Sequence, residues 1–160
     1  MPTTGTNLFR GIQKDQYSDF FTEGEQEPKD GLLYPTFQKS YYVDGKGKKQ
    51  ERPADMVIKD GKVQTGRGVS MFDTEGVLGY GRWKYFWVPE GTEYDENLLL
   101  DGPGPKKAIR QGGVAGCHYQ FEPKIPLTVA SYKGMLDNLA RAAVVRQVKL
   151  GNGAKEEKKE

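Results

Sequence analysis

The sequence has 160 residues, of which 36 % are hydrophobic and 29 % charged, and its formal net charge is +2. This length predicts one domain, because chains of about 100–150 residues form a single hydrophobic core. The balanced charge gives no indication of a nucleic-acid or acidic-membrane partner. One cysteine, Cys117, and one histidine, His118, exclude an internal disulfide and cannot supply an ordinary zinc site.

The N-terminal region begins without an apolar stretch of signal-peptide length, and nothing in the sequence approaches the roughly 20 apolar residues of a membrane span. We therefore expect a protein that is cytoplasmic, or that is delivered into a target cell without a cleavable signal peptide.

The first apolar run, Asn7 to Ile12, predicts a short strand with Arg10 in its middle. A sheet would then hold Arg10 in place.

The next part of the chain alternates aromatic and glycine-rich segments. Leu32 to Val43 holds four tyrosine or phenylalanine side chains, whereas Asp44 to Arg52 is rich in lysine and glycine and predicts a mobile loop. The dipeptide Asp60-Gly61 lies between two short apolar runs and predicts a hairpin turn. The segment Gly61 to Gly68 lacks the lysine-serine ending of a phosphate loop, which excludes a nucleoside triphosphate site of that kind.

Three further strands follow, at Val69 to Phe72, Trp83 to Val88 and Gly116 to Phe121. The second is nearly all aromatic or β-branched, which is typical of a central strand or a strand pair that supplies much of the core. The third carries His118, and because side chains alternate along a strand we expect Cys117 to face the other side, in the core. Glycine and proline residues between the last two strands bracket a basic loop, 106–110, that would suit phosphate contacts.

The longest helical pattern runs from Thr128 to Leu150. It presents an apolar stripe and is followed by Gly151, which predicts the end of the helix. The stripe consists of Val129, Tyr132, Leu136, Leu139, Ala143 and Val148. Residues 154–160 are almost all charged and predict a disordered tail, so the expected domain covers residues 1–153.

Three segments together resemble a known family. They are Leu8-Phe9-Arg10-Gly11, then Gly68-Val69-Ser70-Met71-Phe72-Asp73 with Gly76-Val77-Leu78 behind it, and Cys117-His118-Tyr119 before a proline and the last helix. Their order is that of the type VI secretion effector toxins with an ADP-ribosyltransferase-like fold. Further matches in the same order are Tyr34-Pro35-Thr36-Phe37, Arg52 shortly before Asp55, Val88-Pro89 with Gly91-Thr92, and Leu136-Asp137-Asn138-Leu139 with Arg141.

The resemblance implies an α+β fold with a split antiparallel sheet, a few helices packed on it and a C-terminal helix. It also implies NAD as the cofactor, bound in a cleft between the strands that carry Arg10, Ser70 and His118. The expected function is that of a toxin that transfers ADP-ribose to an unknown intracellular target, or hydrolyses NAD if no acceptor is bound. A cognate immunity protein that blocks the cleft is a further expected partner.

Roles for single residues follow from the resemblance and from the chemistry of NAD. By position, Ser70 corresponds to a serine linked to toxicity, Arg52 and Lys106 to basic residues lining the cleft, and His118 to the histidine of the third segment. The planar guanidinium of Arg10 suits a pyrophosphate. Ser70 would orient the ribose, and His118 would hold it or serve as acid or base.

Two more roles complete the predicted site. Phe72 or Tyr119 would stack on the nicotinamide ring, and Glu122 would stabilise the positive charge that develops on the ribose. From spacing alone five of the site residues also have an ordinary interpretation, and His118 would be a histidine with a purely structural role. Arg10 would then pair with a local carboxylate and Ser70 would end a strand, while Phe72 would belong to the core and Glu122 to a solvated loop.

The chain departs from the family pattern at two points. Val69 stands where the family has a threonine, and the glutamate motif usual in transferases is absent. Two other classes stay open, the first of them because the glutamate motif is missing. The first is a non-catalytic interaction protein that kept the fold. The second, less favoured, is an RNA-binding protein that uses the basic segments Lys46 to Lys49 and Lys106 to Arg110.

Overall fold

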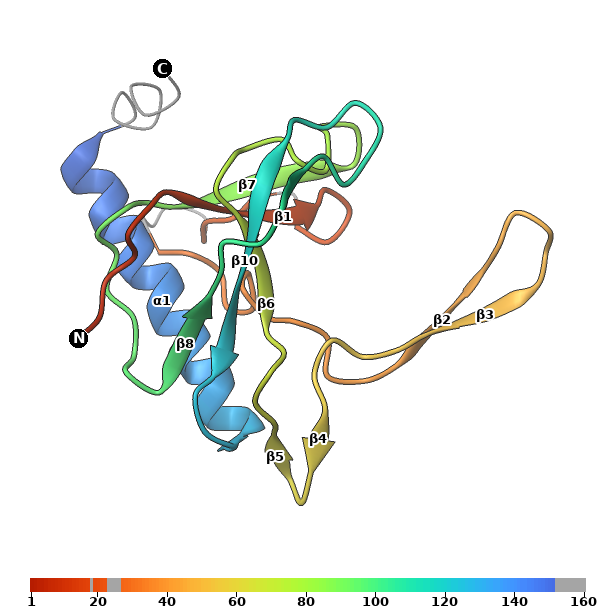
Figure 1. Cartoon of the computed structure of the whole chain (residues 1–160), viewed down its shortest axis with the longest axis horizontal. Helices are drawn as coiled ribbons and strands as arrows, with labels where there is room; N and C mark the ends of the chain where they lie inside the picture. Colours follow the sequence, from red (N-terminus) through yellow and green to blue (C-terminus); the bar gives the residue numbers. More distant parts are fainter. Residues whose placement is uncertain (18, 23–26, 152–160) are drawn as a thin grey trace.

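A six-stranded antiparallel sheet forms the body of the protein in the computed structural model, which describes residues 1–17, 19–22 and 27–151 (Figure 1). The strand order is β7-β1-β6-β10-β8, and β9 pairs with β10. The strands of this sheet are β1 Leu8–Gln13, β6 Val69–Phe72, β7 Trp83–Val88, β8 Leu98–Asp101, β9 Lys106–Lys107 and β10 Gly116–Pro123. The tail predicted at residues 154–160 lies outside the described residues.

Two small sheets and one helix complete the described part of the chain. Strands β4 (Ile58–Lys59) and β5 (Lys62–Val63) form the predicted hairpin around Asp60-Gly61, and β11 (Leu127–Thr128) pairs with β5. Strands β2 (Ser40–Val43) and β3 (Lys49–Arg52) form a separate two-stranded ribbon. The helix α1 (Val129–Leu150) begins after the N-cap Thr128, whose hydroxyl accepts from the Ser131 N–H, and ends at Gly151 as predicted.

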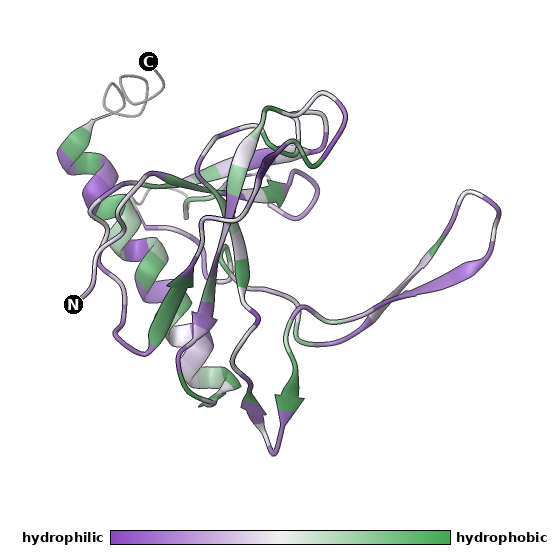
Figure 2. Ribbon diagram, viewed as in Figure 1, coloured by the Kyte–Doolittle hydropathy of each residue, from purple (hydrophilic) through white to green (hydrophobic). Residues whose placement is uncertain are grey.

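The hydrophobic core lies between the sheet and α1 (Figures 1 and 2). Residues of one sheet face pack with the apolar stripe of the helix, and the Tyr132 hydroxyl donates to the Phe121 carbonyl at 2.7 Å. Four of the six predicted stripe residues are buried, namely Tyr132, Leu136, Leu139 and Ala143. Val148 is 63 % exposed, because five residues beyond Ala143 a helix has turned about 140° away from the stripe. The stripe continues through Val144 instead.

The aromatic strand β7 lies at the edge of the sheet, so the central position, one of the two arrangements predicted for it, is wrong. Its composition is explained by its two faces. Phe86 and Val88 belong to the core beneath the sheet, whereas Trp87 on the other face is buried and donates its indole N–H to the Asn7 side chain at 3.1 Å. Trp83 and Tyr85 are only half-buried. An edge strand covered on both faces therefore resembles a central strand in its sequence.

The mobile loop predicted from Asp44 to Arg52 is wrong over its second half, which forms β3. Asp44 stabilises the turn that joins the two strands, because its carboxylate accepts from the backbone N–H groups of Lys46 and Lys48 at 2.9 and 3.0 Å. The ribbon thus depends on backbone pairing and local polar contacts, and not on the apolar residues that a pattern analysis counts.

These observations confirm the expected class, an α+β fold with a split antiparallel sheet and a C-terminal helix. The resemblance implies a few helices packed on the sheet. In the described residues the one α-helix is the C-terminal α1.

Candidate functional site

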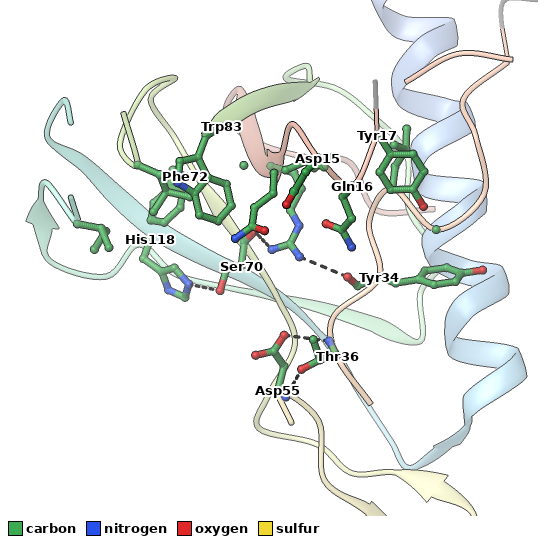
Figure 3. Close-up of a pocket in the computed structure, with 18 of the residues that line it drawn as sticks. Asp15, Gln16, Tyr17, Tyr34, Thr36, Asp55, Ser70, Phe72, Trp83 and His118 are labelled. Carbon is green, nitrogen blue, oxygen red and sulfur yellow. Dashed lines mark hydrogen bonds between the residues drawn. The ribbon is translucent and has the colours of Figure 1, made fainter. Parts of the chain in front are cut away.

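The main sheet splits where β1 meets β6. Their pairing is one residue pair long, Phe9 with Phe72, after which β1 continues along β7 and β6 continues along β10. A cleft of about 720 Å³ lies at this divergence (Figure 3). Its lining comes from β1 and the segment after it, from residues 31–36 and 52–55, and from β6, β7 and β10. Five of the predicted site residues line it, namely Arg10, Arg52, Ser70, Phe72 and His118.

Arg10 extends from β1 immediately after the single pair that joins β1 to β6. Its guanidinium donates through Nη1 to the Ser70 carbonyl at 3.0 Å and through Nη2 to the Tyr34 carbonyl at 3.3 Å. Its Nε is buried and has no hydrogen-bond partner among the described residues. Burial lowers the pKa of Arg10, an effect that the nearby Asp55 charge opposes, yet a guanidinium stays protonated in proteins. The cleft therefore contains a fixed cation with an unused donor.

Ser70 and His118 meet across the β6–β10 pair. The Ser70 hydroxyl lies 3.0 Å from His118 Nε2, and the Phe72 ring meets the imidazole edge-on with 5.6 Å between centroids (Figure 3). Burial lowers the pKa of His118 below its usual 6.5, more than the opposing charge of Asp101 raises it. The imidazole is therefore neutral at neutral pH and can accept a proton from the serine hydroxyl.

One wall of the cleft is fixed by α1. Asp137 of the helix accepts from the Tyr34 hydroxyl at 2.6 Å and from the Gly31 N–H at 3.0 Å. Gly31 has φ +87°, a left-handed conformation that suits glycine. Since the Tyr34 carbonyl in turn accepts from Arg10, the helix holds the arginine in place through this wall.

A second wall joins the two segments that flank the β2–β3 ribbon. The Thr36 N–H donates to the Asp55 carboxylate at 2.9 Å, and the Asp55 N–H donates to the Thr36 hydroxyl at 2.7 Å (Figure 3). This reciprocal pair fixes both residues at the cleft. Arg52 lies just before it and also lines the cleft.

Three predicted site residues do not line the cleft. Lys106 is exposed on β9, and Tyr119 packs against the core on the face of β10 opposite His118. Glu122 is buried near the end of β10, where it accepts from the Gln120 side chain at 2.7 Å. Their proposed roles in binding or catalysis stay predictions.

The structure adds cleft residues for which the sequence analysis proposed no role. The Tyr34-Pro35-Thr36-Phe37 match and the neighbourhood of Arg52 and Asp55 were signals for part of them. No local pattern distinguishes the others from surface residues. The polar and aromatic additions are Gln13, Asp15, Gln16, Tyr17, Tyr34, Thr36, Asp55 and Trp83.

A split antiparallel sheet with a C-terminal helix and a cleft with a buried arginine at the split defines the class of ADP-ribosyltransferase-like proteins. The sequence matches the family model of the Tse2 ADP-ribosyltransferase toxin over residues 6–148, and the chain belongs to this family. The resemblance proposed from the sequence is thereby confirmed. A search of curated proteins finds no match.

Membrane-spanning helices and metal-ligand clusters are both absent from the described residues. No helix in them has the length and apolar character needed to cross a membrane. Likewise, their histidine, cysteine and acidic side chains form no group of three or more that could hold a metal ion.

The Cys117 side chain was expected in the core, but it is only half-buried.

Proposed function

We propose that the protein is a toxin that uses NAD, either to transfer ADP-ribose to an intracellular target or to hydrolyse NAD when no acceptor is bound. The observation that carries this proposal is the Arg10 guanidinium, which is buried at the split of the sheet and lines the cleft. Burying a cation is costly unless opposite charge or hydrogen-bond acceptors compensate for the lost water. An anionic ligand is the chemistry that fits.

The cleft residues suit the parts of NAD. Arg10 would hold the pyrophosphate, with Arg52 at the rim as a second cation. Trp83 and Phe72 line the same cleft and offer aromatic surface for the nicotinamide ring, although Phe72 is only 5 % exposed and offers little of it. When bound, NAD would supply a ribose–nicotinamide bond whose cleavage leaves positive charge on the ribose.

Ser70 and His118 would act on the ribose. The Ser70 carbonyl binds Arg10 and its hydroxyl contacts the imidazole, so the hydroxyl can orient a ribose hydroxyl, and a neutral His118 can accept a proton from the serine. We propose Asp55 as the carboxylate that faces the developing charge, because it lines the cleft. Glu122, the candidate from the sequence, is the alternative.

The proposal extends to partners and delivery. The family assignment supports NAD as substrate and a macromolecular acceptor, together with an immunity protein that covers the cleft. It also supports delivery into a target cell, and one domain over most of the chain.

The test is growth of a cell that expresses the chain beside one that expresses Arg10→Ala with Ser70→Ala, with cellular NAD measured in both. A matched control is Thr65→Ala with Arg67→Ala, since both residues are exposed and neither lines the cleft. We expect growth arrest from the intact chain and from the control, but not from the cleft variant. A fall in cellular NAD that accompanies the arrest would indicate hydrolysis. If the cleft variant also arrests growth, the NAD-site proposal is wrong and the non-catalytic interaction protein is favoured.

A further inference from the structure

The β2–β3 ribbon and its flanking lysine project from the body of the protein (Figure 1). We call residues 39–52 the arm. Its two strands pair with each other and with no other strand of the described chain. All four residues of β2 are exposed, and Tyr41, Tyr42 and Val43 keep 54, 45 and 70 % of their surface in solvent. The arm therefore contributes little to the core.

The aromatic side chains of the arm are nevertheless held in order. The Lys49 ammonium lies 4.6 Å from the centre of the Tyr41 ring, and the Arg52 guanidinium lies 5.1 Å from the centre of the Tyr42 ring. Because side chains alternate along a strand, these two pairs lie on opposite faces of the ribbon. Each face thus presents a tyrosine beside a cation.

The arm also concentrates positive charge. It contains five basic and two acidic side chains, a net charge of +3, whereas the whole chain has +2, so the remainder is net negative. Lys46 and Lys48 are exposed at the turn that joins the strands. The complementary partner is acidic.

One face of the arm leads to the cleft. Tyr42 pairs with Gln50, and Arg52 follows two residues later on the same face and lines the cleft. The reciprocal Thr36–Asp55 hydrogen bonds fix the base of the arm beside the cleft. A partner that lies along this face would end at the site.

We propose that the arm docks the acceptor of the transferase, and that this acceptor is a protein that lays an acidic segment along the face of Tyr42, Gln50 and Arg52. The inference rests on the proposed function, because it names the partner of the same site. Exposed tyrosines with an apolar neighbour and flanking charges are typical of protein interfaces.

A nucleic acid fits this surface less well. Proteins that bind single strands track the phosphates with rows of cations and stack bases on open rings. In the arm, Lys49 and Arg52 already lie against the tyrosine rings, and Lys39 lies 3.6 Å from the Glu51 carboxylate.

The test uses the full chain with Lys46→Glu and Lys48→Glu. The matched control is Lys59→Glu with Lys62→Glu, which makes the same charge change at the other exposed hairpin. Three quantities are measured: NAD consumption without acceptor, growth arrest, and affinity for poly-L-glutamate and for polyuridylate at one salt concentration. None of the changed residues lines the cleft.

We expect the arm variant to consume NAD within about twofold of the unmodified chain, to lose growth arrest, and to bind poly-L-glutamate about tenfold more weakly, while the control stays unchanged. Full growth arrest by the arm variant, or unchanged affinity for poly-L-glutamate, overturns the proposal. So does stronger binding of polyuridylate than of poly-L-glutamate by the unmodified chain, which would indicate a nucleic-acid partner. If the unmodified chain does not consume NAD, the proposed function is wrong. The affinities for poly-L-glutamate and polyuridylate still decide whether the arm prefers an acidic protein segment or a nucleic acid.

Discussion

Replacing Ser70 by alanine separates the chemistry of the cleft from the stability of the fold. The change removes one half-buried hydrogen bond, the 3.0 Å contact with His118 Nε2. Losing such a neutral bond costs about 1 kcal/mol, which lowers the Tm of a chain of this size by about 2–4 °C. The anchor of Arg10 is retained, because Nη1 binds the Ser70 carbonyl, which alanine also has. We therefore expect a folded protein that no longer consumes NAD or arrests growth.

The assay combines a thermal melt with NAD consumption by the purified chain. Thr74→Ala is a suitable control, because its hydroxyl makes one comparable side-chain contact, 3.1 Å to Asp73, and does not line the cleft. It should lose similar stability and keep its activity. A Ser70→Ala protein that melts within a few degrees of the unmodified chain and still consumes NAD would refute the role of this hydroxyl. A much larger loss of Tm would show that the serine is structural.

Three further predictions concern groups around the same cleft. Asp55→Asn should slow NAD consumption at least about tenfold, and more than Glu122→Gln does, since only Asp55 lines the cleft; the opposite order in measured rates would favour Glu122. Because burial lowers the pKa of His118, the unfolded chain takes up its proton first as the pH falls below 6.5. Stability should then fall with pH in that window by at most about 1.4 kcal/mol per unit, and a urea titration of His118→Gln should show a shallower slope. Tyr34→Phe removes the 2.6 Å bond to Asp137 and should cost about 1–2 kcal/mol, a value reduced because the pair is only partly buried; an unchanged urea midpoint would contradict this role of the wall.

Much of the scaffold was predictable because it depends on local patterns. The strand that carries Arg10, the Asp60-Gly61 hairpin and the C-terminal helix each follow from short-range periodicity or turn chemistry. The β3 strand was missed because its support is polar. The edge position of β7 could not be predicted, because burial of both faces gives the same composition as a central strand.

The site was predictable only where the family resemblance reached. It brought together Arg10, Ser70 and His118, which the structure places on three strands around one cleft. The family matches near Tyr34 and Asp55 indicated these segments, but the contacts that make them cleft walls could not be inferred, because they join distant residues, as the Tyr34–Asp137 bond does over 103 residues. For Glu122, spacing gave no indication that a residue four positions after His118 on the same strand lies outside the cleft lining.

The way Ser70 is held has a consequence for the making of the protein. Its carbonyl is bound by a residue 60 positions earlier and its hydroxyl by a residue 48 positions later, and the wall behind Arg10 needs Asp137. On the ribosome, therefore, a growing chain has no complete cleft until nearly all of it has been synthesised. A translation product that stops before residue 118 would be harmless to the cell that makes it.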